Sequence, residues 1–168
     1  MRTNLPITNQ EFVLRDGMTI VSRTDLKGRI TFVNDDFLEA SGFTEAELIG
    51  EPHNIVRHPD MPEAAFADLW ATLKAGRPWT GMVKNRCKDG SFYWVFTHIT
   101  PDFDQRGEIV GYYSVRRCPK RSAIEKIVPV YRQMLEADRK AYDDYLAVLE
   151  PVLEQSRNSQ NTEAKELL

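Results

Sequence analysis

Runs of β-branched and aromatic residues, separated by turn signals, predict five short β-strands in two groups. The first group is a pair joined by the polar turn Asp25–Gly28. The second group contains three strands, of which the first two flank Asp89-Gly90, one of the strongest short signals for a hairpin. The strand after that turn is apolar at both odd and even positions, so we expect it to be covered on both faces. The predicted strands cover residues 19–22, 30–33, 79–86, 92–100 and 109–115.

Between the two groups of strands, apolar residues follow a helical spacing. Thr44 and Glu47 have the pattern of a capping box, and Gly50 ends that short helix. Apolar residues then recur every three or four positions from Phe66 to Leu73. This order of elements predicts an α+β fold, in which one antiparallel five-stranded sheet carries the short helices on one face.

The pattern changes after Ser122, where apolar residues recur every third or fourth position as far as Val152. We expect one long amphipathic helix, or two helices divided near Pro151, with Pro129 marking a kink or the true start. The polar stretch that follows is predicted to be disordered. The predicted organisation is an N-terminal segment (1–17), a folded domain (18–119), a helical extension (120–154) and a polar tail (155–168).

Composition and charge narrow the function classes. Of the 168 residues, 42% are hydrophobic and 28% are charged, which is typical of a globular protein. The formal net charge is −3, so the chain lacks the excess of positive charge that binds nucleic acid or an anionic membrane. No apolar run approaches the roughly 20 residues that span a bilayer, and the first residues lack the apolar core of a signal peptide. Cys87 and Cys118 make neither a disulfide framework nor a zinc site. We therefore expect a cytoplasmic protein without direct membrane insertion and without a nucleic-acid partner.

The segment His53–Pro62 concentrates two histidines, an arginine and an aspartate beside two prolines. Proline fixes φ and restricts the residue before it, so the part from His58 onward should be a stiff, non-helical loop. Such a loop can hold several hydrogen-bonding groups around one polar ligand with little loss of entropy. The alternative is an ordinary connecting loop whose charges face water.

Several motifs together resemble a PAS domain and, within that superfamily, the sensor domain of bacterial aerotaxis (energy-taxis) receptors. The resemblance implies a PAS fold that binds FAD non-covalently and reports its redox state to the chemotaxis machinery. Those receptors continue into a membrane anchor, a HAMP-like module and a signalling coiled coil. We therefore expect either part of a longer receptor or a free-standing sensor that signals through a separate transducer. The motifs that carry the resemblance are Asp25–Asn34, Phe37, Ser41–Phe43, Gly50, Pro52–Pro62, Ala64–Trp70, Pro78–Gly81, Val83–Arg86, Lys88–Gly90 and Tyr93–Val95.

The resemblance also implies polar contacts to FAD. The amide of Asn85 can both donate and accept, which suits the pyrimidine edge of a flavin. Arg57 suits the pyrophosphate or a pairing with Asp60, and His58 can bond a phosphate or a ring oxygen. We expect Asp60 to organise the loop by holding Arg57 or His58. His53 either contributes to the site or caps the short helix that follows it.

Aromatic residues provide candidate stacking surfaces. Trp70 shares a helical stripe with Phe66, so it either belongs to the core or stacks with Phe66 against the flavin. Trp79 follows Pro78 at a strand start and is expected to be exposed, which favours contact with the adenine. Asn34 is expected to cap the first helix, with ligand contact as the alternative.

The predicted function is a redox or oxygen sensor for energy taxis that binds FAD and has no enzymatic activity. A flavin–cysteinyl adduct is not expected, because no cysteine lies in 53–57. One alternative is a haem sensor with His53, His58 or His98 as the axial ligand. Another is a cofactor-free module that pairs through its sheet and C-terminal helix. We also expect a homodimer formed through residues 122–152.

Overall fold

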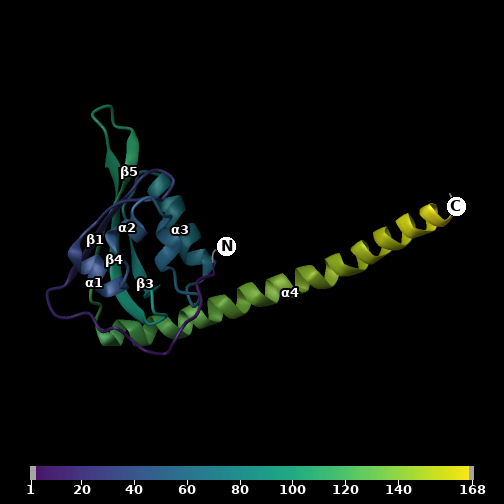
Figure 1. The fold of residues 1–168 in the computed structure, drawn as a ribbon, viewed down its shortest axis with the longest axis horizontal. Coiled ribbons are helices and arrows are strands. Elements are labelled where there is room, and N and C mark those ends of the chain that lie inside the picture. The colour runs from purple at the N-terminus through teal and green to yellow at the C-terminus, as the bar shows by residue number, and fades with distance from the viewer. Residues whose placement is uncertain (1–2, 167–168) are drawn as a thin grey trace.

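The computed structural model describes residues 3–166, except for the side chains of 145 and of 148–166 in the last helix. A mixed strand and helix domain is followed by one long helix that projects from it (Figure 1). The elements are β1 (Thr19–Thr24), β2 (Ile30–Val33), α1 (Asp35–Ser41), α2 (Glu45–Leu48), the 3₁₀ helix η1 (His53–Val56), α3 (Glu63–Lys74), β3 (Trp79–Arg86), β4 (Phe92–Phe103), β5 (Ile109–Arg117) and α4 (Arg121–Glu166).

The five strands form one antiparallel sheet in the order β2-β1-β5-β4-β3. The predicted α+β fold is confirmed, because α1, α2, η1 and α3 cover one face of this sheet (Figure 1). Strand side chains alternate between the two faces. In β4, Tyr93 points into the core beneath the helices, whereas its neighbour Trp94 stacks on Tyr131 of α4 on the opposite face.

The buried core fills the space between the sheet and the short helices. Its fully buried large side chains come from distant parts of the chain, and each contributes about 1.5–3 kcal/mol by leaving water. They include Ile20, Ile30, Phe37, Leu48, Leu73 and Tyr93. This core fixes the positions of the elements that surround the site described below.

Asn34 joins α1 to the sheet and is the predicted N-cap. Its Oδ1 accepts hydrogen bonds from the backbone N–H of Phe37 and of Val21, and its Nδ2 donates to the carbonyl of Thr19 at 2.7 Å. The predicted capping box of Thr44 and Glu47 is also present at the start of α2. Local polar signals therefore position both helices on the sheet.

Strand β4 differs from the prediction on its outer face. Tyr131 of α4 covers Trp94 and donates from its hydroxyl to the carbonyl of Met82 at 2.7 Å. Two residues further on, Phe96 is 48% exposed. The prediction that both faces are covered is thus correct at one end of the strand only, because α4 crosses the outer face at that end.

Helix α4 is continuous from Arg121 to Glu166 and includes both Pro129 and Pro151. The backbone of 155–166 is helical where a disordered tail was predicted, and 167–168 lie outside the described residues. In 155–166, glutamate and glutamine each occur twice and arginine, lysine and alanine once each, and all five favour helix. No glycine follows Pro151 to end the helix. Among the described residues, no helix is both long and apolar enough to cross a membrane.

We predict that Asn34→Ala lowers the free energy of unfolding by about 2–3 kcal/mol, since it removes a helix cap and two further hydrogen bonds. Asn34→Asp keeps the oxygen that caps α1 and loses only the donor to Thr19, so it should cost about 1 kcal/mol. Urea unfolding followed by circular dichroism measures both. Equal effects of the two substitutions would contradict the assigned roles of the two amide atoms.

Candidate functional site

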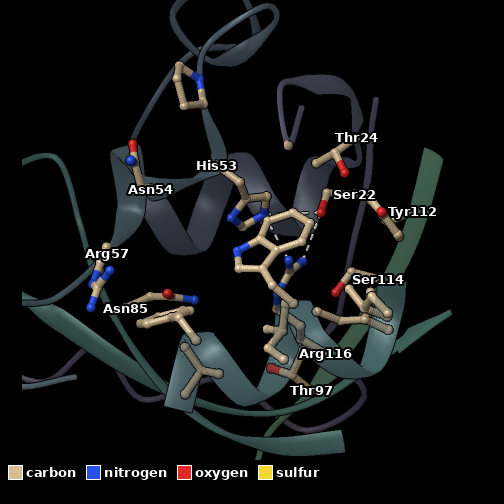
Figure 2. A pocket seen from close by; sticks show the side chains of 18 of the residues that line it. Ser22, Thr24, His53, Asn54, Arg57, Asn85, Thr97, Tyr112, Ser114 and Arg116 are labelled. Carbon is tan, nitrogen blue, oxygen red and sulfur yellow. Dashed lines mark hydrogen bonds between the residues drawn. The ribbon is translucent and has the colours of Figure 1, made fainter. Parts of the chain in front are cut away.

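A cavity of about 360 Å³ lies between the helices and the inner face of the sheet (Figure 2). Its floor comes from β1, β3, β4 and β5, and its walls come from η1, α3 and the turn between β1 and β2. The size is in the range of sites for small organic ligands. In Figure 2, His53 lies above the middle of the cavity and Asn85 lies to its left.

The floor of the cavity is polar where a sheet–helix interface is normally apolar. Ser22, Ser114, Thr97 and Arg116 occupy neighbouring positions on three adjacent strands, because Ser22 pairs with Ser114 and Thr97 pairs with Arg116. The buried hydroxyl oxygens of Thr97 and Ser114 have no hydrogen-bond partner within the described part of the chain. Buried polar atoms are nearly always bonded, so these two hydroxyls indicate a polar occupant of the cavity.

Arg116 is the strongest electrostatic feature of the floor. Its side chain is 4% exposed, and its guanidinium donates to Ser22 Oγ at 3.0 Å and to His53 Nε2 at 2.8 Å. No carboxylate bonds it among the described residues. Burial lowers the pKa of Arg116 to about 10, partly offset by Tyr93. A buried cation without an anionic partner is costly, so this position suits an electron-rich ligand edge.

His53 is held in one protonation state by Arg116. A guanidinium can only donate, so Nε2 of His53 must be the acceptor and the ring proton lies on Nδ1. Burial and then the charge of Arg116 lower the pKa of His53 to about 3. The alternative prediction, that His53 caps the short helix, is wrong. The N-cap of η1 is Pro52, and no side chain caps that helix.

Arg57 and Asn85 are brought together by their backbones. An isolated antiparallel bridge joins Arg57, just after η1, to Asn85 on β3. The guanidinium of Arg57 lies 4.1 Å above the ring of Phe66 and donates to the carbonyl of Met61 at 3.4 Å. Asn85 is 4% exposed and lines the cavity, as do Arg57 and Phe66. The predicted pairing of Arg57 with Asp60 does not form.

His58 and Asp60 lie outside the cavity lining and stabilise the loop instead. Nδ1 of His58 accepts the backbone N–H of Asp60 at 3.1 Å, and Nε2 of the same ring is buried with no hydrogen-bond partner in the described part of the chain. Burial and Lys84 lower the pKa of His58 to about 4, so the ring is neutral. The carboxylate of Asp60 binds Lys84 at 2.6 Å. The loop is non-helical as predicted, but these two side chains do not face the ligand space.

The two tryptophan predictions have different outcomes. Trp79 is 8% exposed, and its indole N–H donates to Asp68 at 2.8 Å, so the expectation of an exposed residue was wrong. Asp68 on α3 satisfies the only polar atom of that ring, which allows its burial. Trp70 packs against the core, as one of its two alternatives predicted, and it also lines the cavity, so stacking against a flavin stays a prediction. Asn34 caps α1 and does not line the cavity.

The residues that sequence reasoning missed are Ser22, Thr97, Ser114 and Arg116. Arg116 stands beside Arg117 near a strand end, where charged residues are usually solvated. The available signal was the position of Arg116 along the strand. It is two residues from Ser114 and four from Tyr112, so all three side chains lie on the inner face of β5. The hydroxyls become adjacent only through strand register.

An N-terminal arm, defined here as residues 4–12, supports the wall of the cavity from outside. The side-chain amide of Asn4 donates to the carbonyls of Asn54 and Arg57, both at 2.9 Å, and so fixes the position of η1. Further along the arm, Glu11 forms an ion pair with Arg121 at the start of α4. The arm therefore connects the cavity wall to the last helix.

Comparison with known proteins is consistent with this geometry. The family model described as "PAS fold" matches residues 30–116, about half of the chain. This chain belongs to the PAS-fold family. The aerotaxis receptor of Escherichia coli (strain K12) is 48% identical over 128 residues, which are 76% of this chain and 25% of that receptor. The predicted resemblance to aerotaxis-receptor PAS domains is confirmed.

Solved structures agree on the PAS fold. The light-state structure of the blue-light photoreceptor Aureochrome1 LOV has a TM-score of 0.62 at 18% identity, covering 69% of this chain and 93% of that one. A Light-Oxygen-Voltage domain studied with a flavin analogue has a TM-score of 0.58 at 21% identity, covering 68% and 86%. At these identities the likeness shows the fold alone. The PAS chain described here spans a quarter of the length of the aerotaxis receptor.

We predict that His53 and His58 make the PAS domain acid-sensitive. Their pKa values in the folded state, about 3 and about 4, lie below the ordinary value of 6.5. Below pH 6.5 the unfolded chain therefore binds more protons than the folded one. Their contribution is complete above pH 6.5 and is lost as the pH falls through that value toward 4 and 3. When the pH falls from 7 to 5, each histidine should lower the free energy of unfolding by about 2 kcal/mol.

Urea unfolding at both pH values measures this loss. The free energy of unfolding of His58→Gln should fall by about 2 kcal/mol less between pH 7 and pH 5 than that of the unsubstituted chain. This difference does not depend on the stability of the variant at pH 7. His98 is exposed on the outer face of β4, so His98→Gln should show the full loss. An unchanged loss in His58→Gln would show that His58 is protonated in the folded state.

Proposed function

We propose that this PAS domain binds FAD non-covalently and senses redox state or oxygen for energy taxis. The observation that carries the proposal is the buried guanidinium of Arg116 on a floor with two unpaired hydroxyls. A flavin ring has an apolar part and an edge rich in carbonyl oxygens and ring nitrogens. The cavity offers the matching arrangement, with apolar walls from α3 and polar groups on the sheet. The likeness to an aerotaxis receptor supports the same ligand class.

The residues present fit the flavin part of FAD better than the whole dinucleotide. Asn85 and the hydroxyls of Thr97 and Ser114 would bond the polar edge of the ring, while Phe66 and Trp70 would cover its apolar surface. A cavity of about 360 Å³ holds a fused ring system, so the rest of the dinucleotide would extend through the opening.

Arg57 is the best candidate for the pyrophosphate. It lies at the edge of the cavity, where its hydrogen bond is to a carbonyl and its ring contact is to Phe66. Glu63 acts on Arg57 through its charge and forms no ion pair with it among the described residues. Guanidinium groups bind phosphate oxygens in pairs. The adenine contact that was expected from Trp79 is not proposed, because Asp68 holds that indole in the core.

A bound flavin would supply reversible electron uptake, and the protein would tune it and transmit the change. Arg116 would stabilise negative charge on the ring, since no protein anion competes for it among the described residues. Transmission would follow β3, where Asn85 faces the cavity and Lys84 faces Asp60 on the opposite side. In the ladder, Lys84 pairs with Trp94, which contacts α4 through Tyr131.

On this proposal the protein is a cytoplasmic sensor without enzymatic activity, and its partner is a chemoreceptor-type signalling domain or a separate transducer. Haem ligation fits the site less well. His98 is exposed on the outer face, His58 does not line the cavity, and Nε2 of His53 already accepts from Arg116. The hydroxyls without partners argue against a cofactor-free module.

The decisive experiment is an absorption spectrum of the purified protein before and after dithionite, with the released cofactor identified by chromatography. We expect flavin bands that bleach on reduction and recover in air, with FAD released. A Soret band would select the haem sensor instead. A colourless protein that takes up no FAD would contradict the proposal.

We predict that Asn85→Ala and Arg57→Ala purify folded but with at least about fivefold less FAD, because each loses a polar contact to the cofactor. Thr80→Ala is the matched control for Asn85→Ala, since Thr80 lies on the same strand and is exposed. The ratio of flavin absorbance to protein measures occupancy. Full occupancy of both variants would remove these residues from the site.

We also propose that the chain is a homodimer joined through α4. Ile124, Val128, Tyr131 and Leu135 form a stripe at heptad spacing that faces the sheet. The same spacing runs through Asp138 to Tyr142, which is 61% exposed, and reaches positions 145, 149 and 152 of the sequence. A second copy of the same helix would cover this continuation as a coiled coil.

Light scattering should give a dimeric mass for the full chain and a monomeric mass for a chain that ends at Pro119. Tyr142→Glu places a charge in the stripe without disturbing the domain and should also give monomers. Lys140→Glu lies off the stripe and serves as the control. A dimer that persists after truncation at Pro119 would place the interface elsewhere.

A further inference from the structure

The indole of Trp70 bridges two sides of the cavity. It extends from α3 to the turn between β1 and β2, where a side chain on Gly28 would lie 3.3 Å from Cζ2 and Cη2 of the indole. Its ring also meets Tyr112 of β5 edge-on, with 5.4 Å between the ring centroids. Trp70 thus closes the space between the helical wall and the sheet.

The surface against which Trp70 rests is rigid. Oδ1 of Asp25 accepts the backbone N–H groups of Lys27 and Arg29, and the carbonyl of Gly28 accepts the N–H of His53 at 2.9 Å. Gly28 has a φ of +74°, a conformation in which glycine is favoured. The turn is therefore fixed to η1 and presents a bare Cα to the indole.

Trp70 itself is held by packing against the core and by its ring contact with Tyr112. Within the described residues its indole N–H donates to no protein group, and the side chain is only half-buried. Trp79 provides the contrast, because its N–H is bonded to Asp68 and its ring is buried. A tryptophan with no hydrogen bond to break can change rotamer at modest cost.

We propose that Trp70 is the gate of the cavity: its indole must swing away from Gly28 for a planar aromatic ligand to enter or leave. The inference rests on the proposed function for the ligand, which is the flavin ring of FAD. A gate differs from a simple binding contact in its kinetics. Entry and exit pass the same barrier, so opening the gate speeds both, while the affinity changes only by the lost ring contact.

The test measures FAD association with the full apo-protein by stopped-flow flavin fluorescence. The slope of the observed rate against FAD concentration gives the association rate, and the intercept gives the dissociation rate. We expect Trp70→Ala to raise the association rate by about tenfold and the dissociation rate by more, because the variant also loses the ring contact to the flavin, so Kd should increase. Trp70→Phe keeps an apolar ring too short to reach Gly28 and should behave similarly, which guards against misfolding of the alanine variant.

Two glycine variants form a matched pair. Gly28→Ala crowds the indole, whereas Gly107→Ala has a similar φ of +79° but meets no atom within 4 Å. Both carry the same backbone strain. We expect faster FAD exchange only in Gly28→Ala, because its methyl group displaces the indole from the closed position.

The outcomes separate the gate from the proposed function. An unsubstituted protein that takes up no FAD would refute the function and the gate together. Uptake with unchanged rates in Trp70→Ala and Trp70→Phe would refute the gate alone. A faster dissociation with unchanged association would make Trp70 a stacking contact and would also refute the gate. Equal behaviour of the two glycine variants would show that Gly28 does not control Trp70.

Discussion

The interior of this PAS domain depends on a buried guanidinium that no carboxylate bonds within the described part of the chain. Arg116 is bonded to a serine and to a neutral histidine, and neither partner carries the compensating charge. Burying such a cation costs free energy that the surrounding packing must supply. The protein retains that cost at a buried position on the floor of the cavity. A site of this kind is stable enough to fold and still favours an occupant that brings electron density.

Several other features follow from that one position. His53 has its tautomer and its neutral state imposed by Arg116, and η1 must therefore start where the ring can reach β5. The arm at residues 4–12 then holds η1 from outside through Asn4. The loop after η1 is stabilised by His58 and Asp60, which use backbone and lysine contacts and leave Arg57 available at the cavity edge.

The fold was accessible from the sequence because its signals are local. Turn glycines, the capping box and strand alternation each act over a few residues, and together they leave few alternatives to an antiparallel sheet with helices on one face. The candidate site was accessible only in part. Asn85 and Arg57 were found through a resemblance and not through their spacing. Arg116 and the hydroxyls were missed because strand register, which sequence does not display, makes them neighbours. Trp79 was misjudged because its partner Asp68 lies on another element.

The length of α4 gives its attachment to the sheet a mechanical consequence. Tyr131 attaches the helix to the sheet through Trp94 and the carbonyl of Met82, and 35 residues of helix lead from Tyr131 to Glu166. At about 1.5 Å per residue this is an arm of about 50 Å. A rotation of one degree at Tyr131 displaces the far end by about 1 Å if the helix stays rigid. Changes in the sheet too small to alter the fold would therefore become movements large enough for a partner to distinguish.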